Sequence, residues 1–161
     1  MSEARSISTN VWKVIGVNLF GVLFATGILS AQTNSDERES TIEGRWKVVS
    51  SETFGEKDSE ELIKGYVMTL ASGKFSVSRA DKDLRAGTYT VDSSARPRRI
   101  GLVFTTGHKG NALGIYEVGG ERLTICYSKL SPSPPPESSR PKEFSSTKDN
   151  QCMLNVYRRL K

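Results

Sequence analysis

From Thr41 to the C-terminus, apolar and polar residues alternate with a period of two, and turn residues interrupt the alternation at short intervals. This pattern is typical of a meander of short antiparallel strands. Between the first two strands, the segment EKDSEELIKG predicts one short helix, capped by Asp58 or Ser59 and ended by Gly65. The predicted strands are eight in number and cover residues 45–54, 66–70, 74–78, 84–91, 99–105, 112–118, 122–127 and 152–159.

Each predicted strand has one apolar face, and a sheet that closes on itself buries all of these faces together. Closure also removes the exposed sheet edges, and eight strands make a barrel wide enough for packed side chains or for one small ligand. The predicted fold is therefore an all-β, eight-stranded antiparallel up-and-down barrel with one short helix after the first strand. An open sandwich of two sheets would show the same alternation. The residues expected to point inward are Trp46, Val48, Phe75, Val77, Tyr89, Val91, Ile100, Leu102, Phe104, Ile115, Leu123, Ile125, Leu154 and Val156.

The N-terminal segment of residues 14–31 is almost entirely apolar and follows a polar start that ends in Lys13. Its length and composition are typical of a signal peptide, with cleavage expected after Ala31. A retained membrane anchor over the same residues is the alternative. The first interpretation predicts a periplasmic or secreted protein and the second a protein anchored in the membrane by this segment, so both place the domain outside the cytoplasm. A flexible linker over residues 32–41 is expected to precede the barrel domain of residues 42–161.

The first strand begins with the tripeptide GRW at residues 44–46, which resembles the Gly-x-Trp signature of the lipocalins. The resemblance implies that the tryptophan lies at the closed end of the barrel and that an arginine of the last strand covers its ring. By alternation, Arg158 shares the inward face assigned to the last strand, so it is the expected partner. A guanidinium over an indole face contributes about 0.5 to 2 kcal/mol. Gly44, Trp46 and Arg158 are therefore predicted to close the barrel.

Longer motifs resemble, in the same order along the chain, the lipocalin-like domain of unknown function typical of planctomycete bacterial proteins. The resemblance covers roughly residues 41–161. It implies a lipocalin-like barrel that is usually exported and has no established activity or ligand. The motifs that carry it are GRWKVVSSE, EELIKG, GTYTVD, GIYEVGGERLTICY and RPKEFSS.

The sequence contains few residues suited to catalysis. The single histidine, His108, lies in a glycine-flanked turn, where a solvated side chain is the ordinary outcome, and nucleophilic catalysis needs a base beside the nucleophile. Glu52 faces inward by strict alternation, at the expected mouth of the barrel. The cysteines and the histidine match no zinc spacing. No catalytic residue, metal site or cofactor is therefore predicted.

The two cysteines, Cys126 and Cys152, lie on strands that are neighbours in the predicted barrel. An exported domain would permit a disulfide between them. Alternation argues against the disulfide, because Cys126 lies on the face opposite Leu123 and Ile125, whereas Cys152 shares the face assigned inward. Cysteines on opposite faces cannot be bridged without a bulge.

The densest positive cluster is the turn that contains Arg96, Arg98 and Arg99, in a chain with a formal net charge of +5. A basic surface of this kind either keeps a domain soluble or attracts acidic polymers. The Pro-rich segment SPSPPPESSRP at residues 131–141 is either a solvated loop or a polyproline-type ligand for a partner. Both segments are candidate contacts for an envelope protein or an anionic polymer. Nucleic acid is not an expected partner.

Two functional hypotheses follow, and both describe a monomeric, non-enzymatic protein. In the first, the barrel holds a small apolar or amphipathic ligand at the mouth opposite Trp46, against Tyr89, Phe104 and Tyr127. In the second, the domain is an interaction or inhibitor-like module of the cell envelope, which acts through its Pro-rich and Arg-rich loops.

Overall fold

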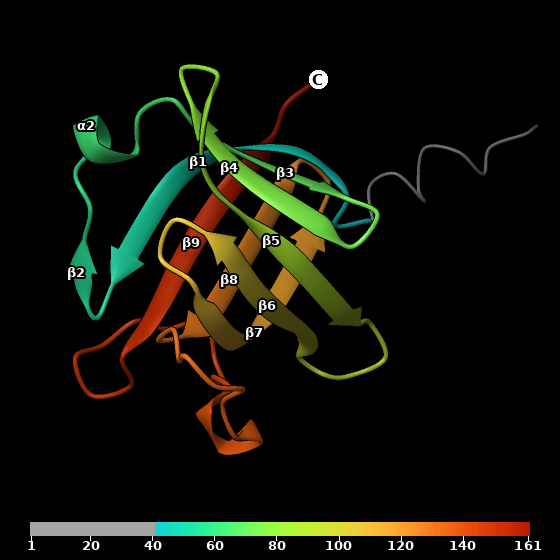
Figure 1. The fold of residues 1–161 in the computed structure, drawn as a ribbon, viewed down its shortest axis with the longest axis vertical. Helices are drawn as coiled ribbons and strands as arrows, with labels where there is room; N and C mark the ends of the chain where they lie inside the picture. The colour runs from blue at the N-terminus through green and yellow to red at the C-terminus, as the bar shows by residue number, and fades with distance from the viewer. Residues whose placement is uncertain (1–40) are drawn as a thin grey trace, which may run out of the picture. The chain divides into compact units, whose positions relative to one another are not determined.

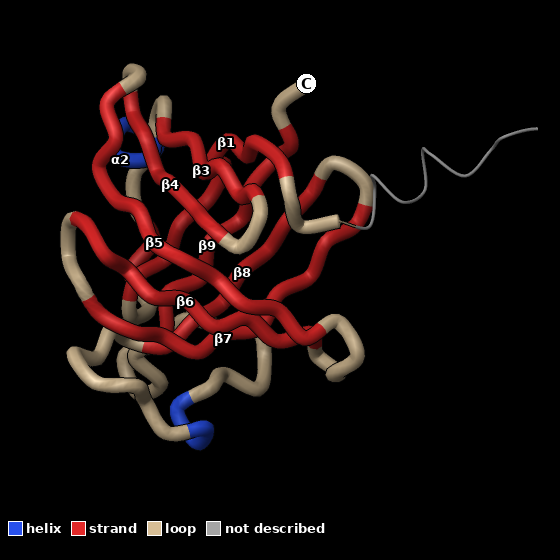
Figure 2. Tube along the Cα trace, turned by 45° about the vertical axis from the view of Figure 1, so that its right-hand side comes forward, coloured by secondary structure: helices blue, strands red, loops and turns tan. Residues whose placement is uncertain are grey.

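Eight antiparallel strands close into a barrel in the computed structural model, which describes residues 41–161 (Figures 1 and 2). Each strand pairs with its neighbours in the sequence, and β1 also pairs with β9, which closes the sheet. The predicted lipocalin-like barrel is therefore confirmed. The barrel strands are β1 (Gly44–Thr53), β3 (Tyr66–Ala71), β4 (Lys74–Arg79), β5 (Lys82–Asp92), β6 (Arg98–Thr106), β7 (Gly110–Gly119), β8 (Arg122–Ser128) and β9 (Cys152–Arg159).

The segment between β1 and β3 contains the predicted helix and one additional element. Strand β2 (Glu56–Lys57) pairs only with the end of β1. Helix α2 (Glu60–Ile63) begins after Ser59, whose side-chain oxygen accepts a hydrogen bond from the Leu62 backbone amide at 3.4 Å. Ser59 is thus the cap, which satisfies one of the free amides of the first turn.

The predictions of a signal peptide or membrane anchor over residues 1–31, and of most of the linker that follows, lie outside the described residues. Among residues 41–161, no helix combines the length and the apolar composition needed to cross a membrane.

The barrel interior is filled by side chains from alternate positions of every barrel strand. Trp46, Leu123, Ile125, Ile100 and Leu70 are among its most completely buried members. The predicted inward positions of β4, β6 and β8 are confirmed. Val91 was predicted inward and is 45% exposed, because it lies near the end of β5, where the strand extends past the packed interior.

Strand β1 contains a bulge between Val48 and Ser50, and this bulge changes which residues face inward. Beyond it, Ser51 and Thr53 line the interior, while Glu52 pairs with the outward residue Leu154. Strict alternation therefore assigned Glu52 to the wrong face, because the extra residue of a bulge shifts the alternation by one.

Strand β9 has the opposite orientation to the predicted one. Met153, Asn155 and Tyr157 line the interior, whereas Leu154 and Cys152 lie on the outer face. The inward assignment of Leu154 and Val156 was therefore wrong. A slip of one residue exchanges the two faces of a strand, and β9 has large apolar side chains on both faces.

A small apolar cluster on the outer surface explains why both faces of β9 are apolar. Ile115, which was also predicted inward, packs there with Cys126 and Cys152, and Phe144 and Leu154 complete this outer cluster. Phe144 belongs to the long connection between β8 and β9, residues 129–151, here called the strap. Because the strap covers part of the outer sheet, the strands beneath it have apolar residues on that side as well.

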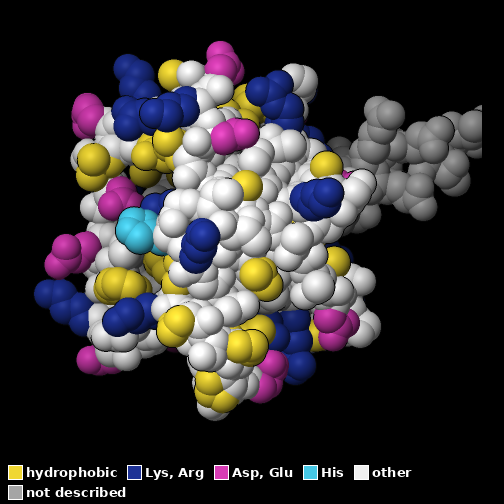
Figure 3. All heavy atoms as spheres, viewed as in Figure 1, with side chains coloured by type: hydrophobic (Ala, Val, Ile, Leu, Met, Phe, Trp, Pro, Cys, Tyr) yellow, Lys and Arg dark blue, Asp and Glu magenta, His cyan; other side chains and the backbone are white. Residues whose placement is uncertain are grey.

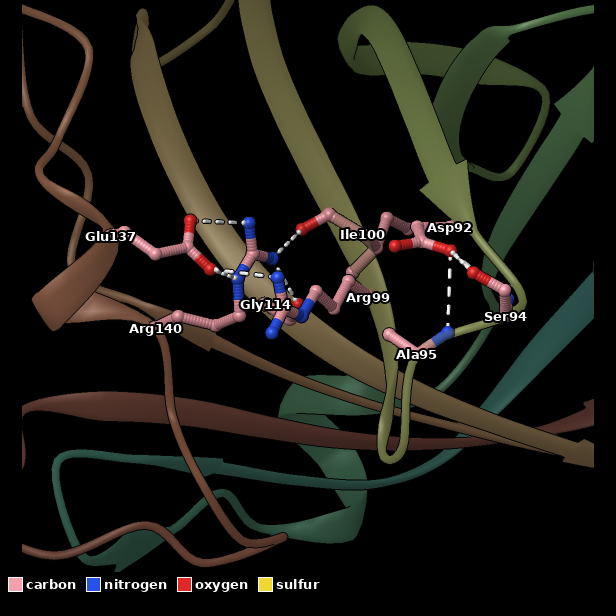
Figure 4. A network of polar contacts seen from close by, with 8 residues as sticks. All are labelled: Asp92, Ser94, Ala95, Arg99, Ile100, Gly114, Glu137 and Arg140. Carbon is pink, nitrogen blue, oxygen red and sulfur yellow. Dashed lines mark hydrogen bonds and ion pairs between the residues drawn. The ribbon is translucent and has the colours of Figure 1, made fainter.

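The strap folds back along the outside of the barrel and contains the short helix η1 (Glu137–Ser139) (Figure 1). The Arg140 guanidinium anchors it by donating to the carbonyl oxygens of Ile100 at 2.9 Å and Gly114 at 2.6 Å. Glu137 accepts two hydrogen bonds from the same guanidinium and forms an ion pair with Arg99 at 3.5 Å (Figure 4). The Pro-rich segment is thus attached to β6 and β7 by charged hydrogen bonds, which are stronger than neutral ones.

Candidate functional site

The closed end of the barrel is built around Trp46. Its indole nitrogen donates to the Ile42 carbonyl at 2.9 Å, and the Arg159 guanidinium lies over the ring with Cζ 4.1 Å from the ring centroid. Arg159 also donates to the carbonyl oxygens of Glu43 and Thr41, both at 2.8 Å. Burial lowers the pKa of Arg159 from its ordinary value.

The arginine that covers Trp46 is therefore Arg159, and the prediction of Arg158 was wrong by one residue. Arg158 is exposed, because the true register of β9 turns it outward. Gly44 has the structural role predicted for it. Its φ of 135° is unfavourable for other residues, and a Cβ at this position would lie 2.6 Å from Nη1 of Arg159.

The barrel contains a cavity of about 350 Å³ away from Trp46, towards the ends of the strands next to α2. Aromatic rings form one side of it. The Phe75 and Phe104 rings meet edge to face with centroids 4.9 Å apart, and the Tyr127 ring lies 6.2 Å beyond Phe104. The volume is in the range of small-molecule sites, and the predicted residues Phe104 and Tyr127 both line it.

Tyr89, the third predicted ligand contact, does not line this cavity. Its hydroxyl lies 3.3 Å from a carboxylate oxygen of Glu43, near the closed end. Burial and the negative charge of Glu43 raise the pKa of Tyr89, so it remains a neutral donor to that carboxylate. The alternation correctly turned Tyr89 inward but did not indicate at which end of the barrel its hydroxyl would lie.

The cavity also has polar groups that the sequence analysis did not identify. Arg85 of β5, together with Asn155 and Tyr157 of β9, lines the same space as Tyr127. On the wall formed by β1, the Ser51 hydroxyl donates to the Asp58 carboxylate at 2.5 Å. An apolar cavity with a few polar groups is the usual composition of a ligand site.

Of these polar residues, only Arg85 could be assigned to the interior from the alternation of the sequence. Arg85 alternates with Gly87 and Tyr89, so the period of two already turned it inward. Asn155 and Tyr157 were missed because the predicted register of β9 placed them outside. Only the outer cluster beneath the strap, which requires the tertiary structure, reveals the correct face.

The two residues weighed as catalytic groups do not line the cavity. His108 is exposed in the turn between β6 and β7, and Glu52 lies on the outer face of β1. Within residues 41–161, no three His, Cys, Asp or Glu side chains gather in a group suited to a metal ion.

Two arginines of the basic turn between β5 and β6 already interact with other groups of the protein. Arg96 donates to the backbone carbonyls of Ser93 and Ala95, both at 2.8 Å, and Arg99 is paired with Glu137 of the strap. Arg98 is half-buried. Lys and Arg side chains are interspersed with Asp and Glu side chains over the face shown in Figure 3. Of the three predicted anion contacts, two therefore already have partners inside the chain.

A second hollow, of about 830 Å³, lies along the strap and is open to solvent. Its walls come almost entirely from residues 128–143, with Ser145, Asn150, Gln151 and Cys152 at one side. Four prolines and five serines are among the residues that line this hollow.

The two cysteines lie together, which reverses the argument from opposite faces. Both belong to the outer cluster, as free and buried thiols on neighbouring strands. Cys126 donates to the Ser145 carbonyl at 3.4 Å, and Cys152 donates to the Asn150 carbonyl at 3.3 Å. Burial raises the pKa of Cys126 to about 12, and the neighbouring Cys152 contributes in the same direction.

We expect these thiols to react slowly in the folded protein. The thiolate is the reactive form, and a raised pKa together with burial makes it rare and inaccessible at mildly alkaline pH. Alkylation by iodoacetamide should be more than about tenfold slower in native buffer than in denaturant, where the pKa returns to its ordinary value. Mass spectrometry over time measures both rates. Equal rates would contradict the burial of Cys126 and Cys152.

Comparison with models of known families, with curated proteins and with solved structures finds no match to this chain.

Proposed function

We propose that this protein is an exported, non-enzymatic binding protein that holds a small apolar or amphipathic molecule in the barrel cavity. The observation that carries the proposal is the cavity of about 350 Å³ with its aromatic lining. A barrel of eight strands is able to fill its own interior, so a remaining space of this size suggests a ligand.

The distribution of side chains along the barrel axis supports this proposal. The closed end is packed around the fully buried Trp46, whereas Phe75, Phe104 and Tyr127 leave space between them and the α2 side. Burial of an apolar molecule against such rings contributes about 25 cal/mol for each Å² of apolar surface removed from water. The rings supply affinity, and the polar groups on the cavity wall supply orientation.

The proposal is tested by titrating the full-length protein with the neutral apolar dye N-phenylnaphthylamine and following its fluorescence. We expect saturable binding, which a large side chain in the cavity weakens. Val77→Trp places an indole in the cavity lining, and its affinity for the dye should fall by about tenfold or more.

The matched control is Val103→Trp, which adds the same side chain at a position that is 43% exposed on the outside of the barrel. Its affinity should equal that of the unmodified protein, and circular dichroism verifies that both variants are folded. Absence of dye binding to the unmodified protein, or equal binding by the two folded variants, would refute the cavity as the binding site.

A further inference from the structure

We infer that the ligand is an amphipathic anion, whose apolar tail occupies the aromatic part of the cavity and whose carboxylate-like head is bound by Arg85 and Tyr157. This inference rests on the proposed function and names the chemical class of the ligand. It depends on the polar groups that share the cavity wall, and on the lack of protein partners for two of them.

Arg85 supplies the positive charge. Arg85 is exposed to solvent and its side chain also lines the cavity from β5, where Arg85 pairs with Val77 of β4, another cavity residue. Among the described residues, no carboxylate lies within ion-pair distance of its guanidinium, and no hydrogen bond holds it. A guanidinium presents a fork of donors that matches a carboxylate, so an unpaired one beside an apolar cavity is suited to an anionic head group.

Tyr157 supplies a second donor. Its side chain is 3% exposed and lines the cavity, and no described residue accepts or donates a hydrogen bond at its hydroxyl. The hydroxyl is not among the fully buried polar atoms that lack a partner, so it is open to the space of the cavity. A ligand oxygen in that space would accept a hydrogen bond from it.

Tyr127 and Asn155 complete the polar wall. The Asn155 side chain lies beside the Tyr127 hydroxyl, on the strand next to β8. Burial raises the pKa of both Tyr127 and Tyr157, and the positive charge of Arg85 acts on both in the opposite direction. The net direction is upward, so both phenols remain protonated donors at neutral pH, as an anion requires.

The acidic side chain of the cavity, Asp58, does not belong to the strands that carry Arg85 and Tyr157, and it already has a hydrogen-bond partner. Asp58 precedes α2, and its carboxylate accepts the Ser51 hydroxyl. An anionic head would therefore lie towards β5, β8 and β9, away from Asp58. The remaining lining is mostly apolar and includes Met68, Leu102, Phe104 and Ile125, which suit a hydrocarbon tail.

The test compares two probes that share a tail, decanoate and decanol, by isothermal titration calorimetry at neutral pH and low salt. We expect the unmodified full-length protein to bind decanoate about tenfold more tightly than decanol, since a charge-assisted hydrogen bond is roughly twice as strong as a neutral one. In Arg85→Gln, decanoate affinity should fall by about tenfold while decanol affinity stays within about twofold.

Two further variants separate recognition from structural effects. Tyr157→Phe should weaken decanoate by about threefold to tenfold, because it removes one donor. Arg122→Gln is the control, since this exposed arginine lies at the start of β8 and does not line the cavity. It removes the same charge and should leave the affinities for both probes unchanged.

The outcomes distinguish this inference from the proposed function. If decanol and the neutral dye bind but decanoate binds no more tightly, or if Arg85→Gln weakens both probes equally, the anionic head is refuted while the binding function stands. If the dye and both probes all fail to bind, the proposed function itself fails. Selective loss of decanoate affinity in Arg85→Gln supports the inference.

Discussion

Replacing Gly87 by alanine is expected to lower the free energy of unfolding by about 3 kcal/mol. A Cβ at this position would overlap the carbonyl oxygen of Val103 and would lie 2.8 Å from the Phe75 ring. The first contact is with the backbone of β6, which cannot rotate away. Relief would therefore require separation of β5 from β6, where the sheet already contains a bulge.

Urea denaturation of the full-length variant, followed by tryptophan fluorescence, measures this loss of stability. The matched control is Gly119→Ala, because a Cβ at Gly119 meets no atom within 4 Å and its backbone is not in the left-handed region. The control should change the free energy of unfolding by less than about 0.5 kcal/mol. Similar midpoints for the two alanine variants would show that the close contact of Gly87 with β6 is wrong.

The Gly87 substitution also bears on the cavity. Gly87 lies opposite Phe75 across the β4–β5 pair, and the missing side chain allows the Phe75 ring to lie against the sheet. A side chain at Gly87 would push this ring towards Phe104, its edge-to-face partner. The position of one glycine therefore helps to determine the space left for a ligand.

Replacing Arg159 by methionine should lower the free energy of unfolding by about 2 kcal/mol, because the variant loses a desolvated cation–π contact and two charged hydrogen bonds. Those hydrogen bonds hold the segment before β1 through the carbonyls of Thr41 and Glu43. Part of the loss is offset, since the buried Nε of Arg159 has no hydrogen-bond partner among the described residues. Methionine keeps most of the side-chain volume of arginine, so the measured loss of stability comes mainly from the missing cation–π contact and hydrogen bonds.

The adjacent residue provides the control for this experiment. Arg158→Met removes the same charge from an exposed position and should change stability by less than about 0.5 kcal/mol. Chemical denaturation of the two variants at the same ionic strength compares them directly. A larger loss in Arg158→Met than in Arg159→Met would restore the register predicted from the sequence and would contradict the structure of β9.

Local patterns in the sequence were sufficient to predict the strands of the barrel and its short helix. The period of two, the Gly-Gly turn between β7 and β8 and the cap at Ser59 each depend on residues close together in the chain. They predicted every barrel strand and the helix, and the inward faces of β4, β6 and β8. Trp46 was also placed correctly, because its strand follows strict alternation up to the bulge after Val48.

The orientation of β9 and the polar wall of the cavity required the tertiary structure. Alternation identifies a buried face only when the other face meets water, and β9 is covered on both sides, by the barrel interior and by the outer cluster. Its apolar residues were therefore compatible with either register. The sequence by itself determined the eight strands and the inward position of Trp46, because both depend on local alternation. The tertiary structure decided that β1 pairs with β9 to close the barrel, that Arg159 covers this tryptophan and that Tyr157 faces the cavity with Arg85, because these depend on the pairing of strands far apart in the chain.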